Sequence, residues 1–123
     1  MIKLVFTKRR LPQLSRAEFQ KYWFEVHAPR VRQHADVLAI QRYVQLHTLD
    51  DPVNDAIRAS RGSMEPYDGI AETWWRRREE LEAALASPAG QRASLLLFED
   101  EKRFIDLPHS SLWLGEERLI LGR

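Results

Sequence analysis

The segment FQKYWFEVHAP, residues 19–29, carries the clearest helical pattern of the chain and places a histidine two residues before a proline. Large apolar side chains recur in it at the spacing i, i+3, i+4 and i+7, at Phe19, Tyr22, Trp23 and Val26. This spacing puts them on one side of an amphipathic helix. The helix is therefore expected to pack an aromatic face on the protein core.

The two ends of this helix are also marked in the sequence. Ser15 followed by Glu18 is a capping-box pattern, in which each side chain accepts a backbone N–H of the other residue. Pro29 cannot donate a backbone N–H and clashes with the preceding turn, so the helix is expected to break or kink near His27–Ala28. A second short helical piece is expected from Pro29 to about His34, because proline fits the first turn of a helix.

Alternating apolar and polar residues predict four strands around this helix. The strands are expected at residues 2–7, 39–48, 67–75 and 112–121. A second helical region is predicted at residues 76–87 and 88–104, and a long connection with one helical turn at residues 50–65. The order strand, helix, strand, strand, helix, strand is the split βαβ, ferredoxin-like pattern. Residues 1–123 are therefore expected to form one α+β domain, with a four-stranded antiparallel sheet and helices on one face.

The alternation in residues 39–48 separates an apolar face from a polar one. Val44 and Leu46 are expected to face the helices. Tyr43, Gln45 and His47 are then expected on the opposite side of the sheet, where their polar groups can line a cavity.

The third predicted strand suggests how that opposite side is covered. Its small residues at positions 69, 71 and 73 suit close packing by a helix, which leaves Ile70, Glu72 and Trp74 on the other side. A sheet face that carries Tyr43 and His47 together with Ile70 and Trp74 is too apolar for water. We therefore expect a homodimer in which two sheets face each other and enclose a cavity.

Composition argues against several classes of function. The chain has no cysteine, which excludes disulfides, thiolate metal sites and cysteine nucleophiles. Its formal net charge is only +1, so no overall field attracts nucleic acid or an anionic membrane. The first residues are too charged for a signal peptide and no apolar run is long enough to span a membrane, which predicts a cytoplasmic protein. Scattered glycines and the lack of a Gly-x-Ser-x-Gly motif argue against nucleotide binding and the usual hydrolase chemistry.

Four blocks of the sequence together resemble the EthD family. They are Phe19-x-x-Tyr22-Trp23-x-x-x-His27-Ala28-Pro29, Tyr43-x-x-x-His47, Tyr67-Asp68-Gly69-x-Ala71-Glu72 and Glu99-Asp100-Glu101-x-x-Phe104-Ile105-Asp106. The family belongs to the dimeric α+β barrel group, which also contains muconolactone isomerases, small polyketide cyclases and cofactor-free monooxygenases. The resemblance implies the ferredoxin-like fold, a homodimer and chemistry that needs no cofactor.

The candidates for catalysis are two histidines and the groups expected beside them. His27 near a helix break can act as a general acid or base near neutral pH, or it can be a packed histidine bonded to a backbone carbonyl. His47 with Tyr43 can bind and protonate an enolate-like oxygen, or it can serve as a cavity lining or dimer contact. Glu72 in an apolar strand needs a partner or a raised pKa, as a base, a substrate-binding acid or a member of a structural salt bridge.

A hydrophobic ligand would be bound by the apolar side chains of the expected cavity. The residues predicted to bind it are Phe6, Gln45, Ile70, Trp74 and Trp113. Packing within the core or across the dimer is the alternative role for the aromatic members of this set. No metal site is expected, because no local spacing such as His-x-x-x-His supports one.

Two hypotheses of different classes follow. The first is a small cofactor-free enzyme that binds a hydrophobic carbonyl or phenolic molecule and moves protons, in an isomerisation, a cyclisation or dehydration, or an oxygen insertion. The second is a carrier or accessory protein of an oxygenase-based degradation pathway, which binds the ligand and returns it unchanged.

Overall fold

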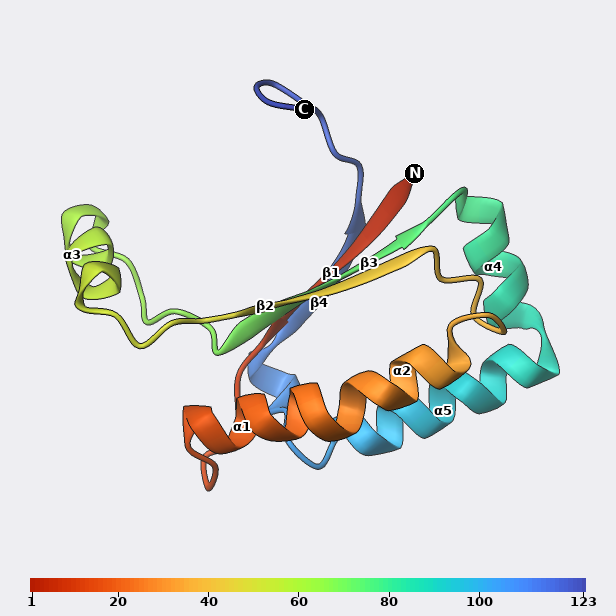
Figure 1. The fold of residues 1–123 in the computed structure, drawn as a ribbon, viewed down its shortest axis with the longest axis horizontal. Coiled ribbons are helices and arrows are strands. Elements are labelled where there is room, and N and C mark those ends of the chain that lie inside the picture. The colour runs from red at the N-terminus through yellow and green to blue at the C-terminus, as the bar shows by residue number, and fades with distance from the viewer.

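In the computed structural model, which describes residues 1–123, four antiparallel strands form one sheet. The strands are β1 (Ile2–Lys8), β2 (Arg42–His47), β3 (Gly69–Trp75) and β4 (Ser111–Gly115), in the order β2-β3-β1-β4. The helices are α1 (Arg16–Tyr22), α2 (Ala28–His34), α3 (Pro52–Arg61), α4 (Arg78–Ala86) and α5 (Pro88–Glu101). Figure 1 shows α1, α2, α4 and α5 together on one face of the sheet. The predicted ferredoxin-like α+β fold is therefore confirmed.

Helix α1 begins and packs as the sequence predicts. Ser15 Oγ accepts the backbone N–H of Glu18 at 3.0 Å, and Glu18 Oε1 accepts that of Ser15 at 2.9 Å. Phe19 and Trp23 are completely buried. Trp23 lies directly against Gly69 of β3, where an added Cβ would overlap the indole ring. The aromatic face of α1 thus holds the helix on the sheet.

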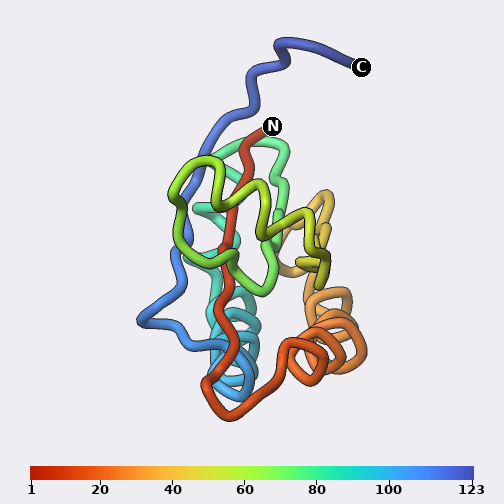
Figure 2. The backbone as a smooth tube through the Cα atoms, turned by 90° about the vertical axis from the view of Figure 1, so that its left-hand side faces the viewer, coloured from red at the N-terminus to blue at the C-terminus, as the bar shows by residue number.

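The interruption expected before Pro29 takes the form of a wider helical turn. Residues Trp23–His27 are π-helical, and the backbone N–H of Ala28 donates to the carbonyl of Trp23. Pro29 lies in the first turn of α2, directly after this wider turn. The helical run therefore continues past His27 instead of ending there, and Figure 2 shows this run beside α5.

Two elements differ in length from the prediction. The connection at residues 50–65 contains the ten-residue helix α3, capped by Asp51, which accepts the Val53 N–H at 2.9 Å. Gly62 ends this helix in the left-handed conformation. The last strand ends at Gly115 and does not reach residue 121. In Figure 1, α3 lies away from the other helices, and the C-terminal segment rises from the opposite face of the sheet.

The register of the sheet shows that the predicted orientation of β2 is wrong. Gln45 lies opposite Ala71, so that Tyr43, Gln45 and His47 face the helices. The Gln45 side-chain amide donates to the Trp23 carbonyl at 3.1 Å, and the His47 ring stacks on the Trp23 ring with 4.6 Å between centroids. Tyr43, Gln45 and His47 are half-buried on this side, where Trp23 of the π-helical turn supplies contacts for Gln45 and His47. We call this side of the sheet the covered face.

The other side of the sheet, the uncovered face, carries the apolar residues of β2 that were expected against the helices. Ile70, Glu72 and Trp74 lie on it as the sequence predicts. Its other members include Val44, Leu46 and Trp113. Leu46 is 59% exposed and Trp113 is 48% exposed. This face therefore presents apolar side chains to water within one subunit.

Candidate active site

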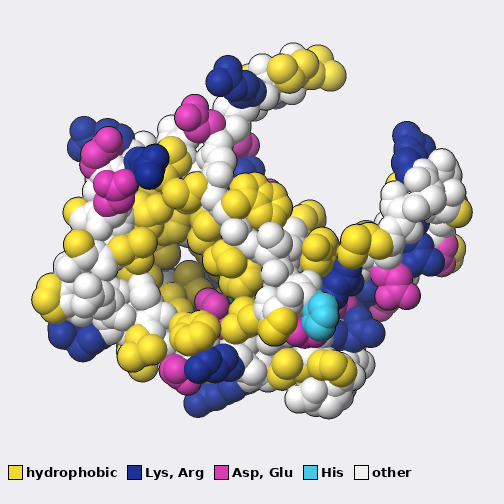
Figure 3. All heavy atoms as spheres, turned by 180° about the vertical axis from the view of Figure 1, so that it is seen from behind, with side chains coloured by type: hydrophobic (Ala, Val, Ile, Leu, Met, Phe, Trp, Pro, Cys, Tyr) yellow, Lys and Arg dark blue, Asp and Glu magenta, His cyan; other side chains and the backbone are white.

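A cavity of about 430 Å³ lies between the covered face and helices α2, α4 and α5. Figure 3 shows its opening, which is surrounded by hydrophobic side chains and contains an acidic group. Most of the wall is apolar, and the polar side chains that reach it are Lys8, His27, Tyr43, Thr73, Ser94 and Glu101. An apolar cavity with a few converging polar groups is typical of a small-molecule site.

His27 stands in the wall of this cavity with a carboxylate behind it. The side chain is 2% exposed, and its Nδ1 lies 2.7 Å from Oδ2 of Asp100. A carboxylate at Nδ1 accepts a hydrogen bond, so the neutral ring carries its proton on Nδ1. The other ring nitrogen, Nε2, has no hydrogen-bonding partner in the chain and is left as an acceptor.

Asp100 is buried at 1% exposure and is held by four side chains. Its carboxylate accepts from Tyr22 at 2.5 Å and from Arg103 at 3.3 Å, and it also binds Arg30 and His27. Burial alone would raise the pKa of Asp100, but the hydrogen bonds from Tyr22 and His27 and the neighbouring positive charges lower it below its usual value. Asp100 is therefore an ionised anchor for His27.

The protonation of His27 is controlled by burial and by a second cation. Burial lowers the pKa of His27, the charge of Lys8 lowers it further, and the resulting pKa is about 4. The Asp100 carboxylate opposes this shift without reversing it, because it is shared with Arg30 and other donors. At neutral pH, His27 is thus an uncharged imidazole with a free acceptor nitrogen, which is the form of a general base.

Lys8, at the end of β1, is the second ionisable group that the cavity brings to His27. It is 1% exposed, and its Nζ lies 4.5, 5.0 and 5.6 Å from the ring centroids of Phe6, Trp23 and Phe104. No side chain or carbonyl accepts a hydrogen bond from this amine. The strand predicted at residues 2–7 ended before Lys8. The position of Lys8 two residues after Phe6 in an alternating strand is the signal that would have put it on the covered face.

Glu101 reaches the same cavity from the end of α5. Burial raises the pKa of Glu101, while the charge of Lys8 lowers it in part. In the sequence, Glu101 and Asp100 belong to the acidic run Glu99-Asp100-Glu101. Nothing local distinguishes the buried members of that run from Glu99, whose partner is the exposed Lys102 at 3.0 Å. Tertiary packing alone selects them.

The strand β2 places its three polar candidates in two different surroundings. Tyr43 lines the cavity, and burial raises the pKa of its hydroxyl. Gln45 donates to the Tyr43 oxygen at 3.1 Å, and its own carbonyl oxygen lies 2.8 Å from His47 Nε2. His47 does not line this cavity, and burial against Trp23 lowers its pKa. His27 and Tyr43 are therefore brought together, whereas His47 is linked to them only through Gln45.

The remaining predicted site residues divide between the two faces of the sheet. Phe6 lines the cavity and belongs to the core cluster. Glu72 is half-buried on the uncovered face with its Oε1 3.5 Å from Lys3 Nζ, which is the salt-bridge alternative. Trp74 donates to Glu117 at 2.9 Å and is covered by polar side chains. Glu72 and Trp74, like Ile70 and Trp113, line no part of the cavity that contains His27.

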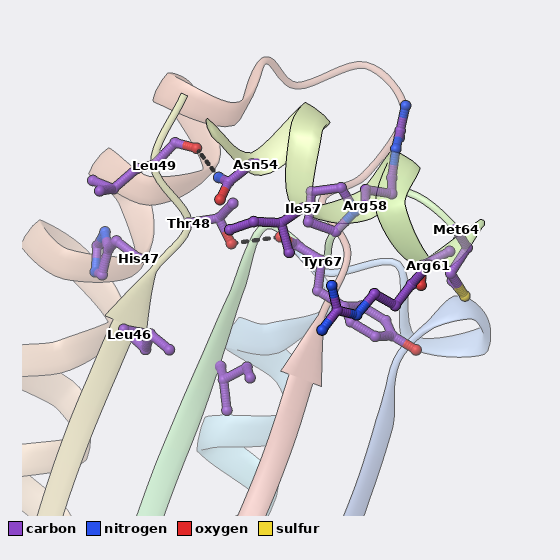
Figure 4. A pocket seen from close by; sticks show the side chains of 13 residues that line it. Leu46, His47, Thr48, Leu49, Asn54, Ile57, Arg58, Arg61, Met64 and Tyr67 are labelled. Atoms are coloured by element: carbon purple, nitrogen blue, oxygen red, sulfur yellow. Dashed lines mark hydrogen bonds between the residues drawn. The ribbon is translucent and has the colours of Figure 1, made fainter. Parts of the chain in front are cut away.

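A second and more open hollow lies between α3 and the ends of β2 and β3. It measures about 720 Å³ and includes His47 and Ile70 in its wall. Figure 4 shows the side chains of α3 and of the segment before β3 around it, with the hydrogen bonds Asn54–Leu49 and Thr48–Tyr67 at its edge. Its ionisable side chains are half-buried, as at His47, Arg58 and Tyr67, or exposed, as at Arg61, and none is as deeply buried as His27 and Lys8 of the smaller cavity. In the whole chain, no three histidine or acidic side chains are arranged to hold a metal ion.

The comparison with protein-family models decides the family of this chain. The model described as the EthD domain matches residues 11–108. The protein belongs to the EthD family. The match includes His27 and Glu101 of the cavity wall and Asp100 behind His27, whereas Lys8 lies just before it. The comparison with curated protein sequences gives no match.

Solved structures with this EthD fold share little sequence with the chain. An EthD family protein from Bacillus halodurans is 19% identical, with a TM-score of 0.64 over 96% of this chain and 99% of that one. SnoaB from Streptomyces nogalater, described as a cofactor-independent oxygenase, is 16% identical, with a TM-score of 0.58 over 99% and 97%. HapK from Hahella chejuensis is 13% identical, with a TM-score of 0.57 over 100% and 97%. These similarities establish the fold.

The structure gives a physical reason for the third EthD-like block of the sequence. Asp68 is 2% exposed and binds Arg10 at 2.6 Å and Arg16 at 2.9 Å, so it fastens the start of α1 to the start of β3. The next residue, Gly69, leaves the space that the Trp23 ring occupies. This block therefore supports the helix that carries His27. None of the helices has both the length and the hydrophobicity needed to cross a lipid bilayer.

Proposed function

We propose that this EthD protein is a cofactor-free enzyme that binds a hydrophobic carbonyl or phenolic molecule and moves a proton with His27. The observation that carries the proposal is the His27–Asp100 pair, 2.7 Å apart, with the free Nε2 of His27 at the wall of an apolar cavity. A cavity of about 430 Å³ is within the range of small-molecule sites.

The chemistry follows from the protonation states of three groups. The neutral His27 takes a proton from a carbon next to a carbonyl, or from a phenol, and the imidazolium that results is stabilised by Asp100. Tyr43, whose hydroxyl keeps its proton, can donate a hydrogen bond to the enolate or phenolate oxygen. Isomerisation, cyclisation or dehydration, and oxygen insertion into an activated ring can all begin with this step.

SnoaB supports this reading to a limited extent. It has the same fold and is described as a cofactor-independent oxygenase. The proposal for the present chain therefore includes reaction of the enolate or phenolate with oxygen, alongside the isomerase and cyclase types. His47 was the second candidate in the sequence after His27, and it lies outside the cavity, with its ring bonded to Gln45.

Proton transfer can be tested with acetophenone, a small aromatic ketone, by following exchange of its methyl hydrogens for deuterium. The unaltered protein should accelerate the exchange. The variant His27→Asn keeps a donor toward Asp100 and removes Nε2, and should lower the rate by roughly 100-fold or more. The matched variant His47→Asn should retain the rate within about twofold, because His47 lies outside the cavity. Equal rates in the two variants would contradict the assignment of His27.

The carrier function remains the second candidate, because most of the cavity wall is apolar and a ligand can be held there without reaction. It predicts that a phenol such as 4-methylphenol quenches tryptophan fluorescence on binding. It also predicts that acetophenone is bound and recovered without deuterium and without a change of mass. Binding without exchange would favour the carrier over the enzyme.

We also propose that the protein is a homodimer in which the uncovered faces of two sheets meet. Exposed apolar side chains support this proposal. Some lie on the uncovered face itself, such as Leu46 and Trp113, and others lie in the C-terminal segment. There, Leu119, Ile120 and Leu121 are 71%, 91% and 93% exposed. Light scattering at micromolar concentration should give twice the mass of one chain, and Leu46→Glu should reduce it. A monomer mass for the unaltered protein would contradict the dimer.

A further inference from the structure

Lys8 differs from every other lysine of the chain in having a buried amine that forms no salt bridge, and the only carboxylate charge acting on it is that of Glu101 in the same cavity wall. The chain has four lysines, and Lys21 and Lys102 are exposed. Lys3 lies 3.5 Å from two carboxylates. Lys8 is 1% exposed, makes no ion pair and ends among three aromatic rings in the wall of the cavity.

An unpaired buried ammonium is an unfavourable choice for a structural position. Removing such an ion from water costs several kcal/mol, and contact with aromatic rings returns only about 2 kcal/mol. A leucine or methionine would fill the same space without this loss. The position of the amine at a cavity wall therefore indicates a chemical use for it.

We propose that Lys8 attaches a carbonyl-bearing ligand covalently, as an imine formed in the cavity between the sheet and the helices. This inference rests on the proposed binding of carbonyl compounds to the same cavity and adds the residue that would hold them. The aromatic cage keeps the amine at one place, and the cavity beside it admits a small hydrophobic carbonyl compound.

The step requires only groups that the cavity contains. The neutral amine of Lys8 attacks the carbonyl carbon, which forms a C–N bond while the carbonyl π electrons move to oxygen, and that oxygen takes a proton. Loss of the second nitrogen hydrogen and of the hydroxyl group, protonated by Glu101, releases one water and leaves the imine. Glu101 can supply this proton because burial raises its pKa. The imine then withdraws electrons from the neighbouring carbon, whose proton His27 can take.

The ionisation of Lys8 agrees with this use. Burial lowers its pKa to about 8, against the opposing charge of Glu101. About half of the Lys8 amines are then neutral at pH 8, compared with roughly 0.3% for an ordinary lysine. Burial therefore increases the share of the neutral, nucleophilic amine at Lys8.

Reductive trapping tests the proposal on the unaltered protein. The protein is incubated at pH 8 with benzaldehyde and cyanoborohydride, which reduces an imine to a stable benzylamine, and the modified residue is located by peptide mass mapping. Modification of Lys8 should exceed that of Lys21 and Lys102 by more than roughly tenfold. The variant Lys8→Met should lose this modification, and Lys21→Arg should keep it. Because the wild-type map locates the adduct by itself, the result does not depend on the folding of the variants.

The possible outcomes separate this inference from the proposed function. If 4-methylphenol binds and acetophenone exchange depends on His27, but benzaldehyde modifies Lys21 and Lys102 and not Lys8, the imine is overturned and the proposed function stands. Modification of Lys8 with no His27-dependent exchange supports the imine and contradicts the base. If neither binding, exchange nor Lys8 modification is observed, both proposals are overturned.

Discussion

Charged groups are buried on one side of the sheet and partly exposed on the other. In the helices packed against the covered face, Asp100 of α5 is 1% exposed and is bound by His27 and three other side chains. On the uncovered face, the Glu72 side chain is about one-third exposed, and its Oε1 lies 3.5 Å from Nζ of Lys3. The same amine lies 3.5 Å from the exposed carboxylate of Glu117. The covered face thus buries its charges in fixed geometry beside a cavity, and the uncovered face exposes apolar side chains among loosely paired charges. The polarity of a strand residue therefore does not tell which face of the sheet it occupies.

The largest difference between the faces should appear when one carboxylate is removed from each. Asp100→Asn should lower the free energy of unfolding by about 4 kcal/mol, because Arg30 and the other partners lose the charge that balances them. Glu72→Gln on the uncovered face should lower it by less than about 1 kcal/mol. Urea unfolding of the two variants measures both values. Similar small losses would show that the Asp100 cluster is not a buried ionic network.

A somewhat smaller effect is expected from pH, and it belongs to the covered face. Below pH 6.5 the unfolded chain binds a proton at His27, whereas the folded protein does not do so until about pH 4. The free energy of unfolding should therefore fall by about 3 kcal/mol through His27 as the pH decreases across this range. Asp100 acts in the same direction, since its pKa is lowered in the folded state.

The His27 share of this pH dependence can be isolated with His27→Asn. The variant should show a flatter decline of stability between pH 6.5 and about 4. His47→Asn is the control and should leave most of the slope in place, because His47 is partly exposed. A slope that is unchanged in His27→Asn would mean that His27 is not kept neutral by the fold.

Packing on the two faces can be compared with one pair of glycine substitutions. A Cβ at Gly69 would overlap the Trp23 ring on the covered face, and Gly69→Ala should lower the free energy of unfolding by about 2 kcal/mol. A Cβ added at Gly115, in β4, would meet no other atom within 4 Å beyond its chain neighbours. Gly115→Ala should therefore change the free energy of unfolding by less than about 0.5 kcal/mol. Thermal unfolding of both variants checks the comparison, and equal losses would refute the close contact at Gly69.

The smallest expected effect is electrostatic and lies inside the cavity. Because the charge of Lys8 helps to lower the pKa of His27, Lys8→Met should raise that pKa by roughly one unit. NMR titration of the imidazole measures the shift, and Lys102→Met serves as the control because its amine lies on the exposed surface. If Lys8→Met leaves the His27 pKa at about 4, burial alone sets it.

Much of the fold could be predicted from local patterns. The capping box at Ser15, the apolar spacing of Phe19 and Trp23 and the small residues of β3 each correspond to what the structure contains. The orientation of β2 could not be predicted, because alternation defines two faces without saying which one the helices cover. The partner that draws Gln45 inward is a carbonyl of the π-helical turn, and that turn leaves no local signature.

The candidate site was predictable only where a residue belonged to a recognisable pattern. His27 and Tyr43 were identified from such patterns and now line one cavity. Asp100 and Lys8 were missed because their importance comes from burial, which depends on the packing of β1 against α5 and the helical run.

The π-helical turn at Trp23–His27 determines where this helical segment can lose a residue and still pack on the sheet. The turn holds one residue more than an α-helix would place there. Deleting an exposed residue such as Phe24 would restore a regular α-helix and leave Phe19 and His27 close to their present directions, because the wide turn absorbs the extra residue. The segment can thus lose one codon within the wide turn, while a one-codon deletion in the regular part of α1 would turn the aromatic face away from the sheet by about 100°.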